Sequence, residues 1–274
     1  MDEKQLKQEL KQIKNNHYAV PDDVDAYPYA QWMLAHIGST DAELRDSLIY
    51  STLAHWIQSG VFRQKELRGL LLQSMNDLFY EIDEKETDAV FRRAFSVLIP
   101  PLILSVHEKE PLLSLEQLYS VADQVLEYAY LEKDARGYVE GKGWAHSTAH
   151  TADALAALAR NLHNREFGLA LLDAVFHKVC VRDYLYIHFE DERLVTVIMT
   201  LLEQHILSAE DWKHWLHHFT TIEKAPVPQN DILIQNIRMF LRSMYFRVLE
   251  HEEYTVVTEA VLKTLKEVQN LVHG

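Results

Sequence analysis

Residues 67–78 read LRGLLLQSMNDL, and their apolar side chains recur every three or four positions from Leu67 to Leu78. This spacing is typical of an amphipathic helix that buries one face. The same spacing returns along almost the whole chain, whereas no segment alternates apolar and polar residues between hairpin turns. The sequence therefore predicts an all-α protein without strands.

The composition agrees with this fold class. Only 8 of the 274 residues are glycine and 7 are proline, shares of about 3% each against a usual ~7% and ~5%. Apolar residues make up 48% of the chain and charged residues 25%, which is ordinary for a packed protein and sufficient for a sizeable core. We expect one all-α domain over residues 1–274.

The periodic segments divide the chain into a series of helices of similar length. They are expected near residues 3–16, 28–37, 41–59, 64–81, 86–107, 115–132, 143–163, 166–187, 191–206, 209–219, 229–250 and 254–272. Two helices with their loops occupy about 40 to 50 residues, close to the period of HEAT-like arrays. The spacing favours a HEAT-like α-superhelix of antiparallel helix pairs, although an irregular bundle would give similar spacing.

Local signals mark some helix boundaries. The pair Pro100–Pro101 lies inside a periodic segment and predicts a break or kink there. Capping boxes are expected at three helix starts, formed by Thr40 with Glu43, Ser114 with Gln117, and Ser208 with Asp211.

Charge and cysteine content restrict the partners and the compartment. The formal net charge of −14 opposes binding to nucleic acid and to anionic membranes. The single cysteine, Cys180, fits a reducing compartment. Residues 1–18 lack the apolar core of a signal peptide, and the most apolar run, residues 95–106, is too short to span a bilayer. We expect a soluble cytoplasmic protein that binds neither nucleic acid nor membrane.

The chemistry-bearing residues cluster after a glycine-rich loop. Residues 134–143 carry three of the eight glycines, and residues 144–153 follow with the sequence WAHSTAHTAD. On one continuous helix, His146, His150 and Asp153 would share a face within roughly 60°. Leucines of the same segment, together with Trp144, would form the opposite, core-facing side.

Three interpretations of this His–His–Asp face remain open. It can be a buried polar network, a metal-free ligand or catalytic site with a histidine as general base, or a metal site for which zinc is the best match. Arg136 of the glycine loop can fold back to pair with Asp153 or to hold an anionic ligand. The candidate ligand-binding or network residues are Arg136, Trp144, His146, His150, Asp153 and Glu192, and the candidate metal ligands are His146, His150 and Asp153.

The same region carries a family resemblance. The segments EKDARGY (132–138), KGWAH (142–146) and AHTAD (149–153) resemble an uncharacterised bacterial family, domain of unknown function 2785. Residues 37–46, 93–96 and 190–194 fit the same family, so the resemblance covers most of the chain. It implies that the glycine loop and the His–His–Asp segment are its hallmark, and it implies no activity. Thr151 stands where a glycine is expected.

Two functions compete. The first is a binding protein for a peptide, a protein or a small polar ligand, because an array of helix pairs offers an extended recognition surface. The alternative is a hydrolase-type enzyme, possibly metal-dependent, that acts on a small polar substrate. No phosphate-binding loop, nucleophile elbow or dinucleotide fingerprint appears in the sequence. We expect the binding protein, without a cofactor, and with zinc as the alternative.

Overall fold

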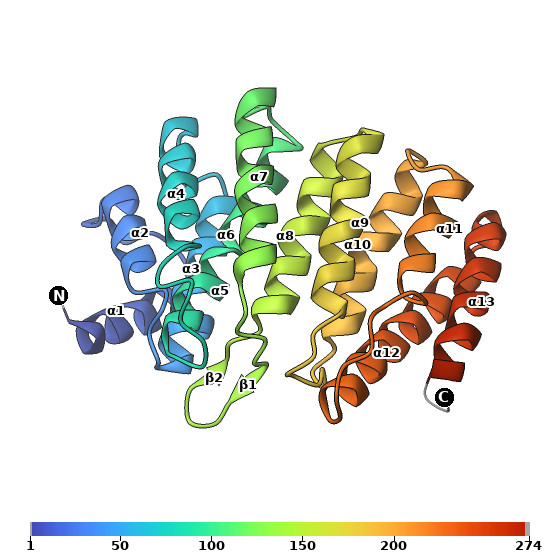
Figure 1. Cartoon of the computed structure of the whole chain (residues 1–274). Helices are drawn as coiled ribbons and strands as arrows, with labels where there is room; N and C mark the ends of the chain where they lie inside the picture. Colours follow the sequence, from blue (N-terminus) through green and yellow to red (C-terminus); the bar gives the residue numbers. More distant parts are fainter. Residues whose placement is uncertain (1, 272–274) are drawn as a thin grey trace. The chain divides into compact units, whose positions relative to one another are not determined.

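The computed structural model describes residues 2–271 and shows an all-α protein with one small hairpin (Figure 1). The helices are α1 (Glu3–Asn15), α2 (Ala26–Ala35), the π-helix η1 (Glu43–Tyr50), α3 (Ser51–Gln58), α4 (Gln64–Asp77), α5 (Ala89–Ser96), α6 (Ile99–His107), α7 (Leu115–Leu131), α8 (Ser147–Asn161), α9 (Arg165–Val179), α10 (Glu190–Gln204), α11 (Ala209–His218), α12 (Gln229–Leu249), the short 3-10 helix η2 (Glu252–Tyr254) and α13 (Thr255–Leu271). The strands are β1 (Tyr138–Val139) and β2 (Gly143–Trp144).

Several predicted helix boundaries differ from the structure, and two of them affect the argument below. The segment 143–163 becomes helical only at Ser147, because its first residues pair as strand β2; the prediction of no strand was wrong here. The segment 166–187 is helical only to Val179. Beyond it, the Asn236 side chain accepts a hydrogen bond from the Tyr186 amide and donates to the Val181 and Tyr184 carbonyls. These hydrogen bonds to Asn236 replace those of a continued helix. The apolar pattern alone therefore placed the end of α9 too late.

The three predicted capping boxes and the predicted break at the proline pair agree with the structure in three of four places. Ser114 and Ser208 both begin helices with capping boxes, as expected. The prolines follow a break between α5 and α6. Thr40 was wrong as a cap, because the Asp41 carboxylate accepts the Leu44 amide hydrogen bond instead. The segment after Asp41 is a π-helix of eight residues, a rare conformation that is frequent at functional sites.

The chain divides into two compact units, residues 1–157 and 158–274, and the boundary falls within α8. In the first unit, α1 packs on η1, α2 on α4, and α4 on α6. In the second, α10 packs on α12, while α11 and α12 both pack on α13. Buried leucine, isoleucine, valine and aromatic side chains form the core of each unit. The single domain over 1–274 stays a prediction.

One stretch among the described residues, Ala89–His107, is long and apolar enough to cross a membrane. It contains α5 and α6 and extends beyond the shorter apolar run seen in the sequence. Of its most apolar window, 78% is buried inside the protein. Helices in a protein core commonly meet the same criterion of length and composition.

The hairpin depends on a glycine at one position. Gly143 has φ +78°, and a Cβ there would lie 2.6 Å from the Ala42 Cβ at the start of η1. Gly141 in the turn has a similar φ of +74° but no atom within 4 Å of its Cβ position. Gly143 is therefore required both for its backbone conformation and for the close approach of the hairpin to η1.

We expect Gly143→Ala to lower the free energy of unfolding by about 2–4 kcal/mol, because it adds steric overlap to left-handed strain. The matched substitution Gly141→Ala carries the strain alone and should cost about 1 kcal/mol. Urea denaturation of both variants measures the difference. Equal losses would mean that the hairpin does not press on Ala42.

Candidate functional site

A buried arginine attaches the hairpin to the first unit. The Arg45 guanidinium donates from Nη2 to the carbonyls of Lys142 (2.7 Å) and Trp144 (2.9 Å), and from Nη1 to the Ser39 carbonyl (2.5 Å). Arg45 is fully buried. One carbonyl from the segment before η1 and two from the hairpin therefore converge on one side chain of η1, which fixes where the hairpin lies.

Aromatic rings of α5 complete the surroundings of Arg45. Its guanidinium carbon lies 4.2 Å from the ring centroid of Phe91 and 4.9 Å from that of Phe95, close enough for cation–π attraction. Burial lowers the pKa of Arg45 to about 10, although nearby Asp46 and Asp41 oppose this shift. The guanidinium therefore stays charged at neutral pH, and carbonyl oxygens and ring faces compensate its charge.

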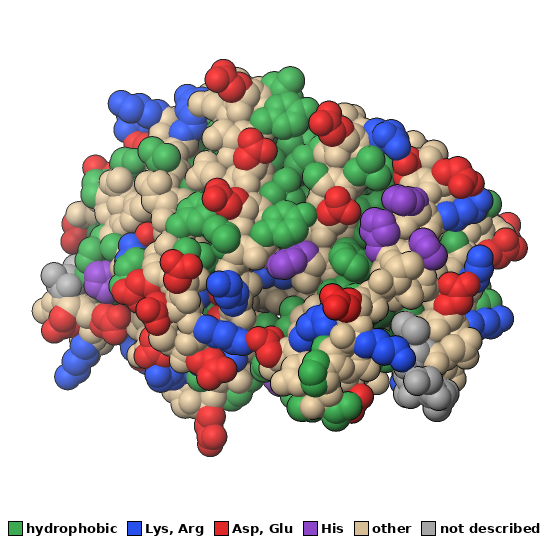
Figure 2. Space-filling model, in the orientation of Figure 1, with side chains coloured by type: hydrophobic (Ala, Val, Ile, Leu, Met, Phe, Trp, Pro, Cys, Tyr) green, Lys and Arg blue, Asp and Glu red, His purple; other side chains and the backbone are tan. Residues whose placement is uncertain are grey.

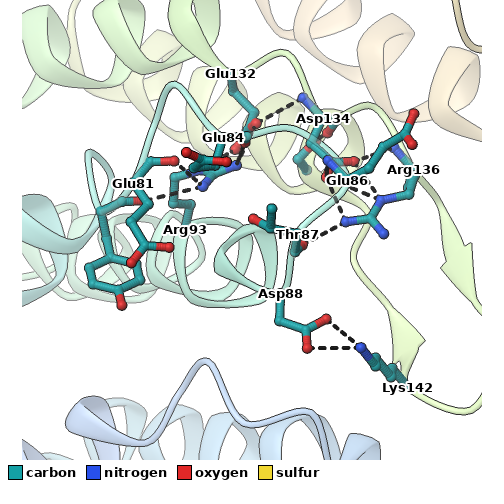
Figure 3. Close-up of polar contacts among 12 residues, drawn as sticks. Glu81, Glu84, Glu86, Thr87, Asp88, Arg93, Glu132, Asp134, Arg136 and Lys142 are labelled. Atoms are coloured by element: carbon teal, nitrogen blue, oxygen red, sulfur yellow. Dashed lines mark hydrogen bonds and ion pairs between the residues drawn. The ribbon is translucent and has the colours of Figure 1, made fainter.

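A second buried arginine joins α5 to the loops at the hairpin base (Figure 3). Arg93 binds the Glu132 carboxylate in a two-point contact, with Nε–Oε2 at 2.6 Å and Nη2–Oε1 at 2.9 Å, and both side chains are fully buried. Its remaining N–H groups donate to the carbonyls of Tyr80, Glu81 and Glu84. All five donors of this guanidinium thus have acceptors, the condition under which a buried charge is tolerated.

Asp134 organises the beginning of the glycine loop. Its carboxylate accepts hydrogen bonds from the Glu86 amide (2.9 Å) and from Arg136, whose Nη2 lies 2.6 Å from Oδ2. Arg136 also donates to the Thr87 carbonyl at 2.7 Å. Arg136 thus already binds a carboxylate two residues away in the same loop, and its pairing with Asp153 stays a prediction.

The aromatic side chains of the hairpin lie at the surface. Tyr138 is 53% exposed and Trp144 is 37% exposed, and their rings meet edge to face with centroids 5.1 Å apart. Trp144 stacks on His146 with centroids 4.4 Å apart and planes inclined by 19°. Trp144 was predicted to face the core of a helix. The prediction was wrong because the residue belongs to β2, where its backbone pairs with Tyr138.

His146 lies just before α8. Its φ is +53°, its amide donates to the Arg136 carbonyl (3.0 Å), and its own carbonyl accepts the His150 amide (3.0 Å). The prediction that His146 shares one helix face with His150 and Asp153 was thus wrong, because His146 precedes α8. The hairpin nevertheless brings the two histidine rings together, edge to face with centroids 5.9 Å apart.

The His150 ring is oriented by α5. Its Nδ1 lies 2.9 Å from the Ala94 carbonyl oxygen, and its ring meets Phe95 edge to face at 5.1 Å. A carbonyl only accepts, so Nδ1 carries the hydrogen and Nε2 carries the lone pair in the neutral ring. His150 is therefore held in the tautomer that a general base or a metal ligand at Nε2 requires.

The other candidates lie in different places. Asp153 is on α8, three residues after His150. Glu192 belongs to the second unit, where its carboxylate lies 3.9 Å from Arg247 of α12. Over the described residues, 2–271, no group of three or more His, Cys, Asp and Glu side chains is placed to hold a metal ion. Zinc binding by His146, His150 and Asp153 stays a prediction.

Sequence reasoning missed the buried charges that build this site. Arg45, Arg93 and Glu132 were noted only for family resemblance, although Arg93 interrupts a strongly apolar segment. A charged residue on the buried face of a predicted helix signals a paired internal charge. That signal was present, but the partner could not be identified, because it lies 39 residues away.

The model of the family described as "Protein of unknown function (DUF2785)" matches residues 78–246. This is more than half of the chain. The chain belongs to this family. The match confirms the resemblance and includes Arg93, Glu132, the hairpin and His150, while Arg45 and residues 37–46 lie outside it. No curated protein and no solved structure matches the chain.

Removing the acceptor of Arg93 tests the buried network of this family member. We expect Glu132→Gln to lower the free energy of unfolding by about 3–5 kcal/mol, because it leaves a buried guanidinium without its counter-charge. Asp88→Asn, which removes an exposed carboxylate 2.6 Å from Lys142 Nζ, should cost less than about 1 kcal/mol. Urea denaturation measures both losses, and a small loss for Glu132→Gln would contradict the role given to this pair.

Tyr128 makes part of the same network dependent on pH. Burial, together with the Glu132 charge, raises its pKa well above the usual 10. Its hydroxyl donates to Glu132 at 3.2 Å. Above pH 10 the unfolded chain loses this proton while the native protein keeps it, so stability should fall as pH rises. We expect the difference in the free energy of unfolding between wild type and Tyr128→Phe to shrink between pH 9 and about 11. Urea denaturation midpoints at each pH measure this difference.

Proposed function

We propose that the protein is a binding protein whose recognition element is the exposed aromatic side of the hairpin, formed by Tyr138, Trp144 and His146. The observation that carries this proposal is the contrast between exposed rings and their buried support. Two large aromatic side chains remain at the surface while fully buried Arg45 and Arg93 hold the backbone around them.

Rigid aromatic side chains suit recognition for energetic reasons. A ring that is already oriented loses little conformational entropy when a partner covers it. Trp and Tyr also supply large apolar areas with a polar edge, and they dominate measured binding energies at interfaces. The Trp144–His146 stack and the Tyr138–Trp144 contact orient these rings before any partner arrives.

We propose that the partner is a segment of a peptide or protein. A small polar ligand is the alternative partner. Acidic side chains are spread over the face seen in Figure 2, and the net charge is −14. This charge opposes nucleic acid and anionic membranes as partners.

We further propose that the helices form a HEAT-like α-superhelix of antiparallel pairs. The packing within the second unit supports this: α11 contacts both α9 and α13, while α10 contacts α12. Alternate helices therefore pack together as two layers, the arrangement expected when helix pairs stack. In the first unit, α4 packs on both α2 and α6, so alternate helices are in contact there too.

A second candidate function rests on the orientation of His150. Its Nδ1–H is directed at the Ala94 carbonyl, which leaves the basic lone pair on Nε2. This is the state that a general base requires in a hydrolase-type reaction on a small polar substrate. A zinc ion bound by His146, His150 and Asp153 is the metal-dependent form of the same candidate.

The binding proposal is tested by selecting displayed peptides on the intact protein and measuring their affinity by calorimetry. We expect Trp144→Ser to weaken a selected peptide more than about 10-fold, because central aromatic residues commonly contribute that much. Leu72→Ser removes another large apolar side chain, which is 64% exposed but lies on α4, so it should leave affinity unchanged. Equal affinities for wild type and Trp144→Ser would overturn the proposal.

His150→Gln separates the two candidate functions. A binding protein should retain its selected peptides within about threefold, because Tyr138 and Trp144 remain in place. Elemental analysis of the purified protein addresses the zinc alternative. One zinc per chain that disappears in His150→Gln would favour the metal-dependent enzyme over the binding protein.

A further inference from the structure

The first unit contains a cavity away from the hairpin, between α1, the loop that follows it and α2. Its volume is about 850 Å³, within the range of about 300–1,000 Å³ typical of ligand sites. All of its lining residues lie between Glu9 and Trp32. The cavity therefore lies outside residues 78–246, the part of the chain that the family shares.

The walls of this cavity carry charge of one sign. Glu9, Asp23 and Asp25 contribute three carboxylates, and none of the lining residues, all of which are described, is Lys, Arg or His. Two lysines of α1 pair with carboxylates outside the cavity: Lys7 with Asp41, and Lys11 with Glu43. A cation entering the cavity therefore meets carboxylates that these lysines do not neutralise.

Two aromatic rings complete the cavity. Tyr29 and Trp32 both line it and meet edge to face with centroids 5.8 Å apart. The Tyr29 hydroxyl donates to Glu9 at 3.0 Å, which holds this carboxylate beside the rings. Burial and this hydrogen bond raise the pKa of Tyr29, so the phenol remains a donor at neutral pH. Carboxylates next to ring faces are the combination that attracts organic cations.

The loop that forms one wall is held in place from behind. Tyr18 has φ +60°, its carbonyl accepts a hydrogen bond from Trp56 Nε1 at 2.8 Å, and its ring stacks on His55 with centroids 3.7 Å apart. Asp25 caps α2 through the Tyr27 amide. The cavity is therefore preformed, and a ligand does not have to order the loop.

We propose that this cavity binds an arginine side chain of a peptide partner. A guanidinium is planar, so it stacks on an indole ring and at the same time donates in a fork to a carboxylate. An ammonium group meets only the charge and is more strongly hydrated. The cavity is open to a peptide because Glu9, Tyr29 and Trp32 are half-buried and Asp23 is exposed.

The test uses the whole chain of residues 1–274, labelled with ¹⁵N, and follows the Trp32 indole signal, which Trp32→Phe identifies. The probe is the peptide acetyl-Gly-Arg-Gly-amide, and the control is the same peptide with neutral citrulline in place of arginine. We expect a saturable shift of the Trp32 signal with the arginine peptide and none with citrulline. No shift with arginine, or the same shift with citrulline, would overturn the proposal.

Two neighbouring acidic residues provide matched variants. Asp23 lines the cavity, whereas the adjacent and equally exposed Asp22 does not. Asp23→Asn should weaken the arginine peptide about fivefold, the effect of removing one partly exposed charge pair. Asp22→Asn should leave its affinity unchanged. Equal effects of both variants would mean that binding depends only on the overall charge. Equal affinity for a lysine peptide would mean that the cavity does not select arginine. Either result contradicts the proposal.

This inference is independent of the hairpin proposal. Trp144→Ser should not alter the Trp32 shift, and Asp23→Asn should not alter binding at the hairpin, because the two features share no residue. A failed arginine titration would therefore leave the hairpin proposal intact.

Discussion

Two fully buried guanidinium groups, Arg45 and Arg93, constrain the loops of the first unit. A buried charge is stable only where acceptors surround it in good geometry. The acceptors here are backbone carbonyls and a carboxylate on loops distant in sequence. Satisfying the two charges therefore also determines the positions of the hairpin and of the loop that precedes α5.

This explains why a hairpin with only two residues in each strand is ordered. Such a hairpin is marginal on its own. Arg45 binds the carbonyls of β2 and of the turn, and Gly143 allows the backbone to approach η1. The stability of the recognition surface thus comes from charge compensation beneath it, and the rings above remain available for a partner.

The sequence predicted the helices well and the site only in part. Three-to-four-residue periodicity locates a helix because burial of one face drives it, so α7 was found to within one residue at its end. The start of α4 was also correct, although its end was placed four residues too late. The hairpin was missed because it lacks the alternating pattern of a half-buried strand. Its order comes from Arg45, 97 residues from its partner Lys142. His146 and His150 were paired correctly in space but for a wrong reason, since only His150 is helical.

The helix α5 connects these parts. Phe91 and Phe95 stack on Arg45, Arg93 binds Glu132, and the Ala94 carbonyl orients His150. Successive residues of one short helix thus support the hairpin, its base and the histidine. A small rotation of α5 would shift all three contacts at once, since packed interiors do not deform residue by residue. The buried face of α5 is therefore the element through which stability and the proposed recognition surface are coupled.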